Sequence, residues 1–388
     1  MESKAQVSSI SMEESSFEIP IELITEILSR LPVKSLLRFR CVSKSWLSLI
    51  SSPEFAYTHL GIAANSKEYT QHSVILKSCP PDFKLKNCSL SSLLYDSVTE
   101  AFDLGYPMKK PRGYVRIMGS VNGLVCLVIE EKYFLLWNPS IRKFKKLPDP
   151  RGGDYIMYGF GYDEFHDDYK VVISDRLSYD SLDHVGVRIY SLKSDSWRNI
   201  RERWSGKLPS LWGVLLNGKL HWTSLTRSDI VYIDLADEKW GKMKQPCFGK
   251  GDFDIWLCMG VLGSDLSLFC NIPKTRADMW VMKEYGVKES WTKMFTVNWS
   301  DDPVEYAFCP PFCMSNKGEI LFGFGSTFMI YNPKDSSIRY PEVTNRENLV
   351  GEKEEAQGLE ERLRSGIVFS FGTFLAANSK FVFRSTNS

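Results

Sequence analysis

The sequence predicts a mainly β protein, in which a small module of three helices precedes a β-propeller with six blades. Apolar residues recur at helical spacing only near the N-terminus, between residues 17 and 60. Beyond residue 71, short apolar runs alternate with Gly, Asn, Asp and Pro turns, a pattern typical of many strands. A pair of aromatic residues then recurs at intervals of 42 to 53 residues, which is the size of a propeller blade.

The helical module follows a polar, serine-rich segment at residues 1–16, which we expect to be a disordered tail. Pro20 suits the first turn of a helix, and Leu31 precedes Pro32, where a helix is disfavoured. The apolar positions are Ile24, Ile27, Leu28 and Leu31 in the first helix, Val33, Leu36 and Leu37 in the second, and Val42, Trp46, Leu49 and Ile50 in the third. Pro53 starts a last turn. We place the module at residues 17–60 and a linker of small and polar residues at 61–71.

Two explanations fit the many large apolar side chains of so short a module. A chain of this size buries too little surface for a secure core of its own. Some apolar side chains should then stay exposed and form a docking surface for a partner protein. The alternative is that these helices pack on the rest of the same chain.

The propeller is predicted to span residues 72–388. The aromatic pairs that mark its repeats begin at Tyr95, Trp137, Tyr190, Tyr232, Tyr285 and Tyr331. Hairpin signals precede three of these pairs, at 122–123, 217–218 and 316–318. Strands near 72–77 and 367–375 are expected to close the ring. A charged stretch at 341–366 interrupts the last blade and should be a solvated loop or a short surface helix, with a regulatory or binding role as the alternative.

Composition argues against several classes of function. The 48 basic and 47 acidic residues leave a net charge of +1, so no overall field favours nucleic acid or an anionic membrane. None of the nine cysteines forms a C-x-x-C pair, and Cys126 and Cys270 lie in apolar runs. This usage indicates a reducing compartment, the cytoplasm or the nucleus. The N-terminus lacks the pattern of a signal peptide, and no apolar run is long enough to span a membrane.

The residues offer no motif for catalysis, a metal or a cofactor. The five histidines are scattered, and no Cys or His spacing matches a zinc site. Phosphate-binding loops and a nucleophile elbow are absent from the sequence. The carboxylates Asp163, Glu164, Asp167 and Asp168 lie between two strand-like runs, so we expect a solvated hairpin tip rather than a calcium or acid–base site. Cys41 precedes an apolar helix and is expected to be buried rather than reactive.

The helical module carries a dense motif, ILSRLPVKSLLRFRCVSKSW at 27–46, together with Ile19-Pro20 before it and Pro53-Glu54-Phe55 after it. This pattern resembles the plant F-box. Further on, GSVNGLVC at 119–126, WNPSIR at 137–142, GFGYD at 159–163 and VRIYSL at 187–192 resemble the F-box-associated, kelch-like domain of the same plant family. The two resemblances together cover roughly residues 17–340.

The resemblance implies a substrate receptor of a cullin-type ubiquitin ligase. F-box helices dock on a Skp-type adaptor, through which the cullin and RING subunits are bound, and the propeller loops bind the protein substrate. Carried over to this chain, adaptor binding falls to Ile19, Pro20, Ile24, Ile27, Leu28, Leu31, Pro32, Val33, Leu36 and Leu37, and Val42 and Trp46 fall in the module's own core. Relatives with this layout act in self-incompatibility or limit immune receptors, and nothing in the sequence separates these settings.

Two alternatives from other classes stay open. An interaction protein that uses the F-box only to hold the adaptor would bind the adaptor without assembling the cullin. A propeller enzyme would need convergent His, Tyr or carboxylate groups, which the scattered histidines do not favour. On the resemblance, the chain has no catalytic residue and acts by raising the local concentration of substrate lysines near the ubiquitin-carrying enzyme.

Overall fold

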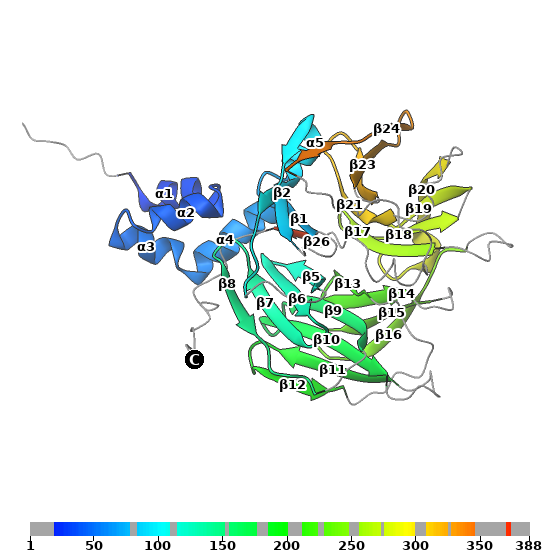
Figure 1. Ribbon diagram of the computed structural model, residues 1–388, viewed down its shortest axis with the longest axis horizontal. Helices are drawn as coiled ribbons and strands as arrows, with labels where there is room; N and C mark the ends of the chain where they lie inside the picture. The colour runs from blue at the N-terminus through cyan, green and yellow to red at the C-terminus, as the bar shows by residue number, and fades with distance from the viewer. Residues whose placement is uncertain are drawn as a thin grey trace, which may run out of the picture.

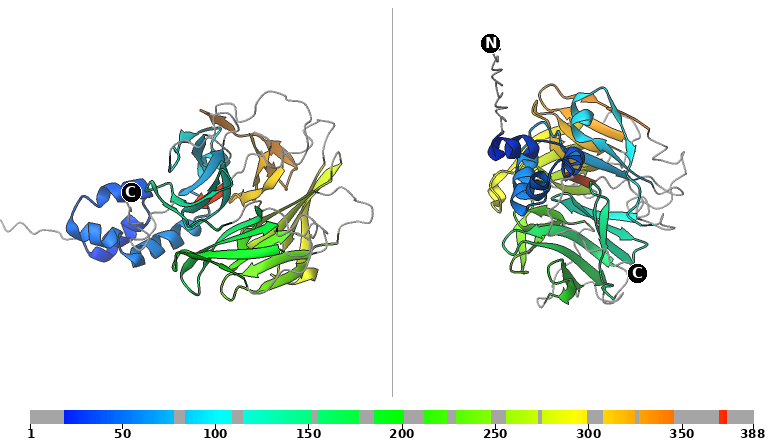
Figure 2. Two further views of the ribbon diagram at one scale, coloured as in Figure 1. Left: turned by 60° about the horizontal axis from the view of Figure 1, so that its bottom comes forward. Right: turned by 90° about the vertical axis from the view of Figure 1, so that its left-hand side faces the viewer.

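The computed structural model describes residues 19–77, 84–108, 115–151, 155–176, 185–200, 212–223, 229–247, 256–272, 275–298, 308–324, 327–345 and 370–373. Within these residues the chain forms a helical module and a six-bladed β-propeller, so the predicted mainly β architecture is confirmed. Figures 1 and 2 show the helices projecting from one side of the propeller, whose blades follow one another around a ring.

The module has four helices where the sequence predicts three and a last turn. They are α1 (Ile21–Ser29), α2 (Val33–Phe39), α3 (Lys44–Ile50) and α4 (Pro53–Ala64). Pro20 and Pro32 stand immediately before α1 and α2, where a missing amide proton costs nothing. The hydroxyls of Ser43 and Ser52 accept hydrogen bonds from backbone amides in the first turns of α3 and α4. Each short helix therefore has a residue at its start that fixes where it begins.

Helix α4 is longer than predicted, because residues 61–64, which the sequence places in the linker, form its last turn. Gly61 lowers helix stability at this point. Ala63 offsets that cost, since it is 1 % exposed and packs in one cluster with Val33. The connection to the propeller is therefore the shorter segment 65–71.

The propeller consists of six four-stranded antiparallel sheets. The first blade is β26 (Ser370–Thr373), β1 (His72–Lys77), β2 (Leu85–Ser89) and β4 (Phe102–Asp103). The second is β5 (Val115–Val121), β6 (Leu124–Ile129), β7 (Tyr133–Asn138) and β8 (Lys143–Lys146), and the third is β9 (Tyr155–Asp163), β10 (Asp168–Arg176), β11 (Val185–Ser191) and β12 (Ser196–Asn199). The fourth is β13 (Val214–Leu216), β14 (Lys219–Thr223), β15 (Asp229–Asp234) and β16 (Trp240–Lys244).

The fifth blade is β17 (Trp256–Leu262), β18 (Asp265–Ile272), β19 (Arg276–Met282) and β20 (Trp291–Asn298), and the sixth is β21 (Phe308–Met314), β22 (Ile320–Phe324), β23 (Thr327–Asn332) and β24 (Ser337–Arg339). Helix α5 (Leu90–Tyr95), the 3₁₀ turn η1 (Lys288–Ser290) and the paired strands β3 (Val98–Glu100) and β25 (Glu342–Thr344) lie outside these sheets. Large apolar side chains of neighbouring blades pack together, as Leu220 and Trp222 of the fourth blade do with Val172 of the third.

Two distant parts of the chain meet in the first blade. β26 pairs antiparallel with β1, with Thr373 opposite His72, which confirms the strands predicted to close the ring. A second contact joins the sixth blade to the first, because β25 pairs in parallel with β3. β25 occupies the first residues of the charged stretch predicted at 341–366, and residues 346–366 lie outside the described residues.

The predicted Asn-Gly hairpins are confirmed at β5–β6 and β13–β14. Both residues of each turn have positive φ, 50° and 78° at Asn122 and Gly123, and 50° and 70° at Asn217 and Gly218. Positive φ at both central residues is the turn geometry that matches the twist of paired strands. The third predicted hairpin signal, at 316–318, lies in the turn between β21 and β22, where Gly318 has a φ of 86°.

The aromatic pairs coincide with the hairpin between the third and fourth strands in some blades only. Trp137 lies opposite Phe144 in the second blade, and Tyr190 lies opposite Trp197 in the third. Tyr95, by contrast, is the last residue of helix α5, because the connection between β2 and β4 is helical rather than a tight turn. The prediction of a strand end at Tyr95 is therefore wrong.

Candidate functional site

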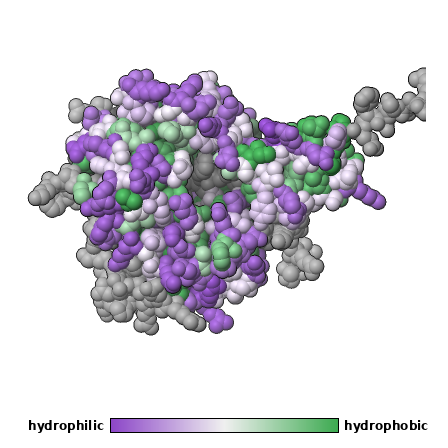
Figure 3. All heavy atoms as spheres, turned by 180° about the vertical axis from the view of Figure 1, so that it is seen from behind, coloured by the Kyte–Doolittle hydropathy of each residue, from purple (hydrophilic) through white to green (hydrophobic). Residues whose placement is uncertain are grey.

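The candidate docking surface consists of apolar side chains that the helical module leaves exposed. The core is complete without them, since Leu28, Leu36, Ile50 and Phe55 are each at most 7 % exposed and pack together. Six large aliphatic side chains nevertheless stay 40–60 % exposed: Ile19, Ile21, Leu23, Ile27, Val42 and Leu47. Figure 3 shows apolar side chains gathered on the part of the module beside the N-terminal segment. Ile19, Ile21, Leu23 and Ile27, from the start of the module and from α1, are termed the α1 surface below.

The structure separates the ten residues that the resemblance assigned to adaptor binding. Four are exposed: Ile19, Pro20, Ile27 and Pro32. Three are partly buried against the module's own core: Ile24, Leu31 and Leu37. The remaining three are corrected, because Leu28 and Leu36 are 1 % exposed and Val33 is 7 % exposed. Side chains so deeply buried hold the module together and offer a partner almost no surface.

Val42 also needs a correction, since it was predicted in the core and is 59 % exposed. Helix α2 ends at Phe39 and α3 begins only at Lys44, so Val42 lies in the turn between them rather than on a helix face. Cys41 lies in the same turn and is exposed, so the prediction that it is buried is wrong for the same reason. Trp46, from α3, packs edge-on against Phe39 with ring centroids 5.6 Å apart.

Sequence spacing misses Ile21, Leu23 and Leu47 as surface residues. Helix α1 has nine residues and carries apolar side chains at 21, 23, 24, 27 and 28, more than one stripe of a short helix requires. This surplus is the signal that could have identified the exposed face, because a helix that is apolar on two sides covers a core with one of them and leaves the other open.

Two family models match this chain, the F-box domain at residues 17–57 and the F-box associated beta propeller domain at residues 84–346. The chain belongs to the F-box proteins with an F-box-associated propeller. It is 35 % identical to an F-box/kelch-repeat protein of Arabidopsis thaliana, over 84 % of this chain and 91 % of that protein. It is 33 % identical to F-box protein CPR1 of the same plant, over 81 % of each chain. A solved nidogen/laminin complex is similar at a TM-score of 0.43 and 10 % identity, over 78 % of this chain and 97 % of that one.

The F-box lies against the propeller face that carries the turns after the first and third strands of each blade, termed the turn face below. In a blade of four antiparallel strands, the turns after the first and third strands share one face, and the connection to the next blade starts from the other. Tyr57 of α4 bonds to Asp167 in the β9–β10 turn, and Tyr69 of the linker bonds to the backbone of Met314 at the end of β21. Both partners lie on the turn face, so the opposite face points away from the F-box.

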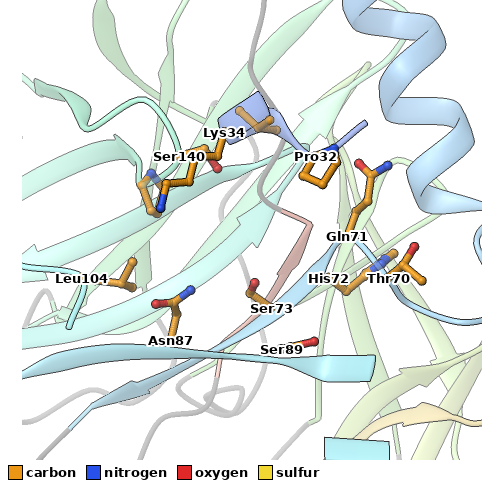
Figure 4. A pocket seen from close by; sticks show the side chains of 12 residues that line it. Pro32, Lys34, Thr70, Gln71, His72, Ser73, Asn87, Ser89, Leu104 and Ser140 are labelled. Atoms are coloured by element: carbon orange, nitrogen blue, oxygen red, sulfur yellow. The ribbon is translucent and has the colours of Figure 1, made fainter. Parts of the chain in front are cut away.

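A hollow of about 260 Å³ lies where the start of α2 faces the first two blades (Figure 4). Its lining combines the apolar residues Pro32, Val33, Leu104 and Pro139 with polar ones, among them Lys34 of the F-box, Gln71 of the linker and Asn87 of the first blade. The amide nitrogen Nε2 of Gln71 donates a hydrogen bond to the backbone oxygen of Arg30, the residue that follows α1, at 3.1 Å. This part of the junction is therefore open and is bordered by a hydrogen bond between the linker and the F-box.

The β9–β10 hairpin carries the predicted carboxylate cluster, and two of its four carboxylates are buried rather than solvated. Asp163 and Asp168 are 2 % and 4 % exposed, whereas Glu164 is exposed as predicted. Asp163 pairs with Lys170 at 2.9 Å and also contacts His166. Burial opposes ionisation of Asp163, but the hydrogen bonds from Lys170 and His166 outweigh it and lower the pKa of the carboxyl. These groups hold the hairpin together and leave no free carboxylate pair for acid–base chemistry.

Buried histidines in the propeller have structural partners. The ring nitrogen Nε2 of His221 lies 2.6 Å from the hydroxyl of Tyr285, and burial lowers the pKa of His221 to about 4. Across the described ranges, no group of three or more His, Cys, Asp or Glu side chains is placed to hold a metal ion. Over the same part of the chain, no helix is long and apolar enough to cross a membrane.

Proposed function

We propose that this F-box protein is the substrate-recognition subunit of an SCF-type ubiquitin ligase. In this proposal the F-box binds a Skp-type adaptor, through which the cullin and RING subunits join, and the propeller binds the protein to be ubiquitinated. The α1 surface is the observation that carries it. Its four large apolar side chains are 47–60 % exposed on a module whose core is already filled by others. Exposed apolar side chains gathered in this way indicate a protein-docking site.

The propeller face opposite the F-box is the proposed substrate side. The connections between successive blades span residues 147–154, 200–213, 245–255 and 299–307, and they join strand ends on that face. Several turns on the F-box face are shorter, as at 122–123 and 164–167, whereas α5 and η1 lie in longer connections on that face, at 90–101 and 283–290. Binding residues concentrate in longer loops that a rigid scaffold positions. In the proposed complex the adaptor and the substrate thus occupy opposite ends of one chain.

The proposed mechanism uses geometry instead of a catalytic residue on this chain. Holding the substrate beside the ubiquitin-carrying enzyme makes an intermolecular transfer effectively intramolecular, which raises the local concentration of substrate lysines. The chain would act in the cytoplasm or the nucleus, where a thiol as exposed as that of Cys41 stays reduced.

The test is a pull-down of the full chain with a plant Skp-type adaptor, the cullin and the RING subunit. The double variant Leu23→Glu/Ile27→Glu places two carboxylates on the α1 surface, where the side chains it replaces are more than half exposed. It should keep its fold and lose the adaptor and, with it, the cullin. Ile338→Glu is the matched control, because Ile338 is also exposed, at 42 %, but lies on β24 of the propeller.

Each outcome of this pull-down decides between stated alternatives. If the wild-type chain retains both adaptor and cullin and only the α1-surface variant loses them, the ligase proposal stands. If the wild-type chain retains the adaptor without the cullin, it is an interaction protein held by the adaptor. If the α1-surface variant binds the adaptor as tightly as the wild type, the α1 surface is not the docking site and the proposed function loses the observation that carries it.

A further inference from the structure

The F-box and the propeller share no hydrophobic cluster within the described part of the chain. Each cluster of buried apolar side chains there lies wholly in the F-box or wholly in the propeller with its linker. Where α2 faces the first two blades, the hollow separates the F-box from the propeller (Figure 4). Because no apolar core joins the two parts within the described ranges, the orientation of the F-box relative to the propeller depends on the hydrogen bonds that cross the junction and on the linker.

Helix α4 supplies the first polar contact that crosses the junction. Phe55 and Ala56 of α4 are buried in the F-box, whereas the hydroxyl of Tyr57 donates a hydrogen bond to Asp167 Oδ1 of the propeller at 2.9 Å. Desolvation, aided by the nearby Asp167 carboxylate, raises the pKa of Tyr57, so the hydroxyl stays protonated and remains the donor.

The acceptor of this contact is held in place by the propeller itself. Asp167 Oδ1 also accepts a hydrogen bond from the hydroxyl of Tyr162, at 2.7 Å. Asp167 has a φ of 51° in the β9–β10 turn, a conformation that the hairpin imposes. Tyr57 therefore binds to a fixed point on the third blade.

Gln71 supplies a second contact across the junction. It directly precedes β1, and the nearby Tyr69 hydroxyl anchors the linker to Met314 O of the sixth blade at 2.9 Å, so Gln71 moves with the propeller. Its bond to the oxygen of Arg30 reaches the F-box just after α1. Tyr57 bonds to the third blade and Gln71 stands at the start of β1 in the first blade, so the two bonds connect the F-box to different blades and together oppose rotation about the linker.

We propose that Tyr57 and Gln71 are positioning residues, whose hydrogen bonds to Asp167 and Arg30 fix the orientation of the F-box relative to the propeller. On the proposed ligase function, this orientation determines where a bound protein lies relative to the ubiquitin-carrying enzyme. Only the consequence for the bound protein rests on the ligase proposal. The fixed orientation is a property of the isolated chain and is tested without a partner.

The chain offers a pair of natural labelling sites for that test. Cys41 of the F-box and Cys247, which follows β16 of the propeller, are exposed. Cys79, which lies outside the described residues, and Cys309, which lies in β21, are replaced by serine in every sample. Spin labels on Cys41 and Cys247 of the full chain then report the distribution of distances between the two parts by pulsed electron paramagnetic resonance.

The double variant Tyr57→Phe/Gln71→Ala should convert a single narrow distance peak into a broad distribution, with an unchanged melting temperature. Tyr190→Phe is the matched control, because it removes the same kind of tyrosine–aspartate bond, to Asp195 at 2.7 Å, within the propeller alone. This control should keep the narrow peak of the wild type. The same narrow peak in the double variant would overturn the proposal.

A second measurement separates this inference from the ligase proposal. In the reconstituted complex, the double variant should bind the adaptor with wild-type affinity but transfer ubiquitin to the chain's own propeller lysines more slowly and at more dispersed sites. Broadened distances with an unchanged pattern of transfer would overturn the role in positioning. Failure of the wild-type chain to bind the adaptor would instead refute the ligase proposal and leave the distance result intact.

Discussion

Ile27 and Leu28 are neighbours in α1, but their alanine variants should lose different properties. Leu28→Ala should lose stability of the F-box, and Ile27→Ala should lose affinity for the adaptor. Leu28 is 1 % exposed and packs with Leu36, Ile50 and Phe55. Leu28→Ala leaves a cavity and should cost about 2–5 kcal/mol. The F-box spans residues 19–64, for which the usual stability per residue gives roughly 2–7 kcal/mol in total. The variant should therefore leave much of the F-box unfolded.

Ile27→Ala should leave the fold intact and weaken docking. Ile27 is 58 % exposed, so its truncation should change the free energy of unfolding by less than about 0.5 kcal/mol. If the adaptor buries this side chain, the variant loses about 2 kcal/mol of apolar burial on binding. That loss corresponds to a dissociation constant roughly 30-fold higher.

Two measurements on the full chain separate these outcomes. Hydrogen exchange of peptides from α1 to α4 reports the stability of the F-box, and calorimetric titration with the adaptor reports its affinity. Leu28→Ala should lose protection throughout the module, while Ile27→Ala should keep protection and lose affinity. Ile338→Ala, on the exposed surface of β24, should change neither. Equal loss of protection in Ile27→Ala and Leu28→Ala would refute the division of α1 into a core face and a docking face.

Three further perturbations test the propeller. Gly159→Ala would place a Cβ atom 2.8 Å from the fully buried Leu220. Urea unfolding should therefore show a free energy of unfolding lower by about 1–3 kcal/mol, while adaptor binding persists. A variant as stable as the wild type would contradict the packing between the third and fourth blades. Burial lowers the pKa of His72 and His221 from 6.5 to about 4, so between these values the unfolded chain binds protons that the native chain does not. The free energy of unfolding should therefore fall as pH drops through this window, by on the order of 3 kcal/mol for each histidine, and His221→Gln should show a shallower slope. Truncation before residue 370 removes β26 and should abolish cooperative melting of the propeller without loss of F-box helicity; a propeller that still melts cooperatively would show that β26 is dispensable.

The blades are predictable from sequence where their signal is local. An Asn-Gly pair selects its turn through the backbone conformations of two residues, so the hairpins at Asn122 and Asn217 need no knowledge of distant contacts. The aromatic spacing fails at Tyr95 because spacing counts residues without seeing what connects them. There, Ser89 caps a helix by accepting a hydrogen bond from the amide of Ser92, and α5 replaces the short turn that joins the third and fourth strands in the second and third blades.

The docking surface is predictable only in outline. The motif places it on the F-box, but the helical spacing of α1 fits two faces equally well. The choice between them depends on where α1 packs against Phe55 and Ile50, a contact between residues far apart in the chain. The junction is harder still, because the residues Tyr57 and Asp167 are 110 positions apart and neither belongs to a motif that points to the other.

The first blade is assembled from the two extremes of the propeller, so its inner strand β26 is translated after every other described strand, although its neighbour β1 is translated first. A ribosome-bound chain therefore exposes a finished F-box long before the ring can close, since domains fold in the order in which they are synthesised. On the proposed function, a prematurely terminated chain would occupy an adaptor without a completed propeller. A late nonsense mutation in this gene would then act as a competitor of the intact protein rather than as a simple loss.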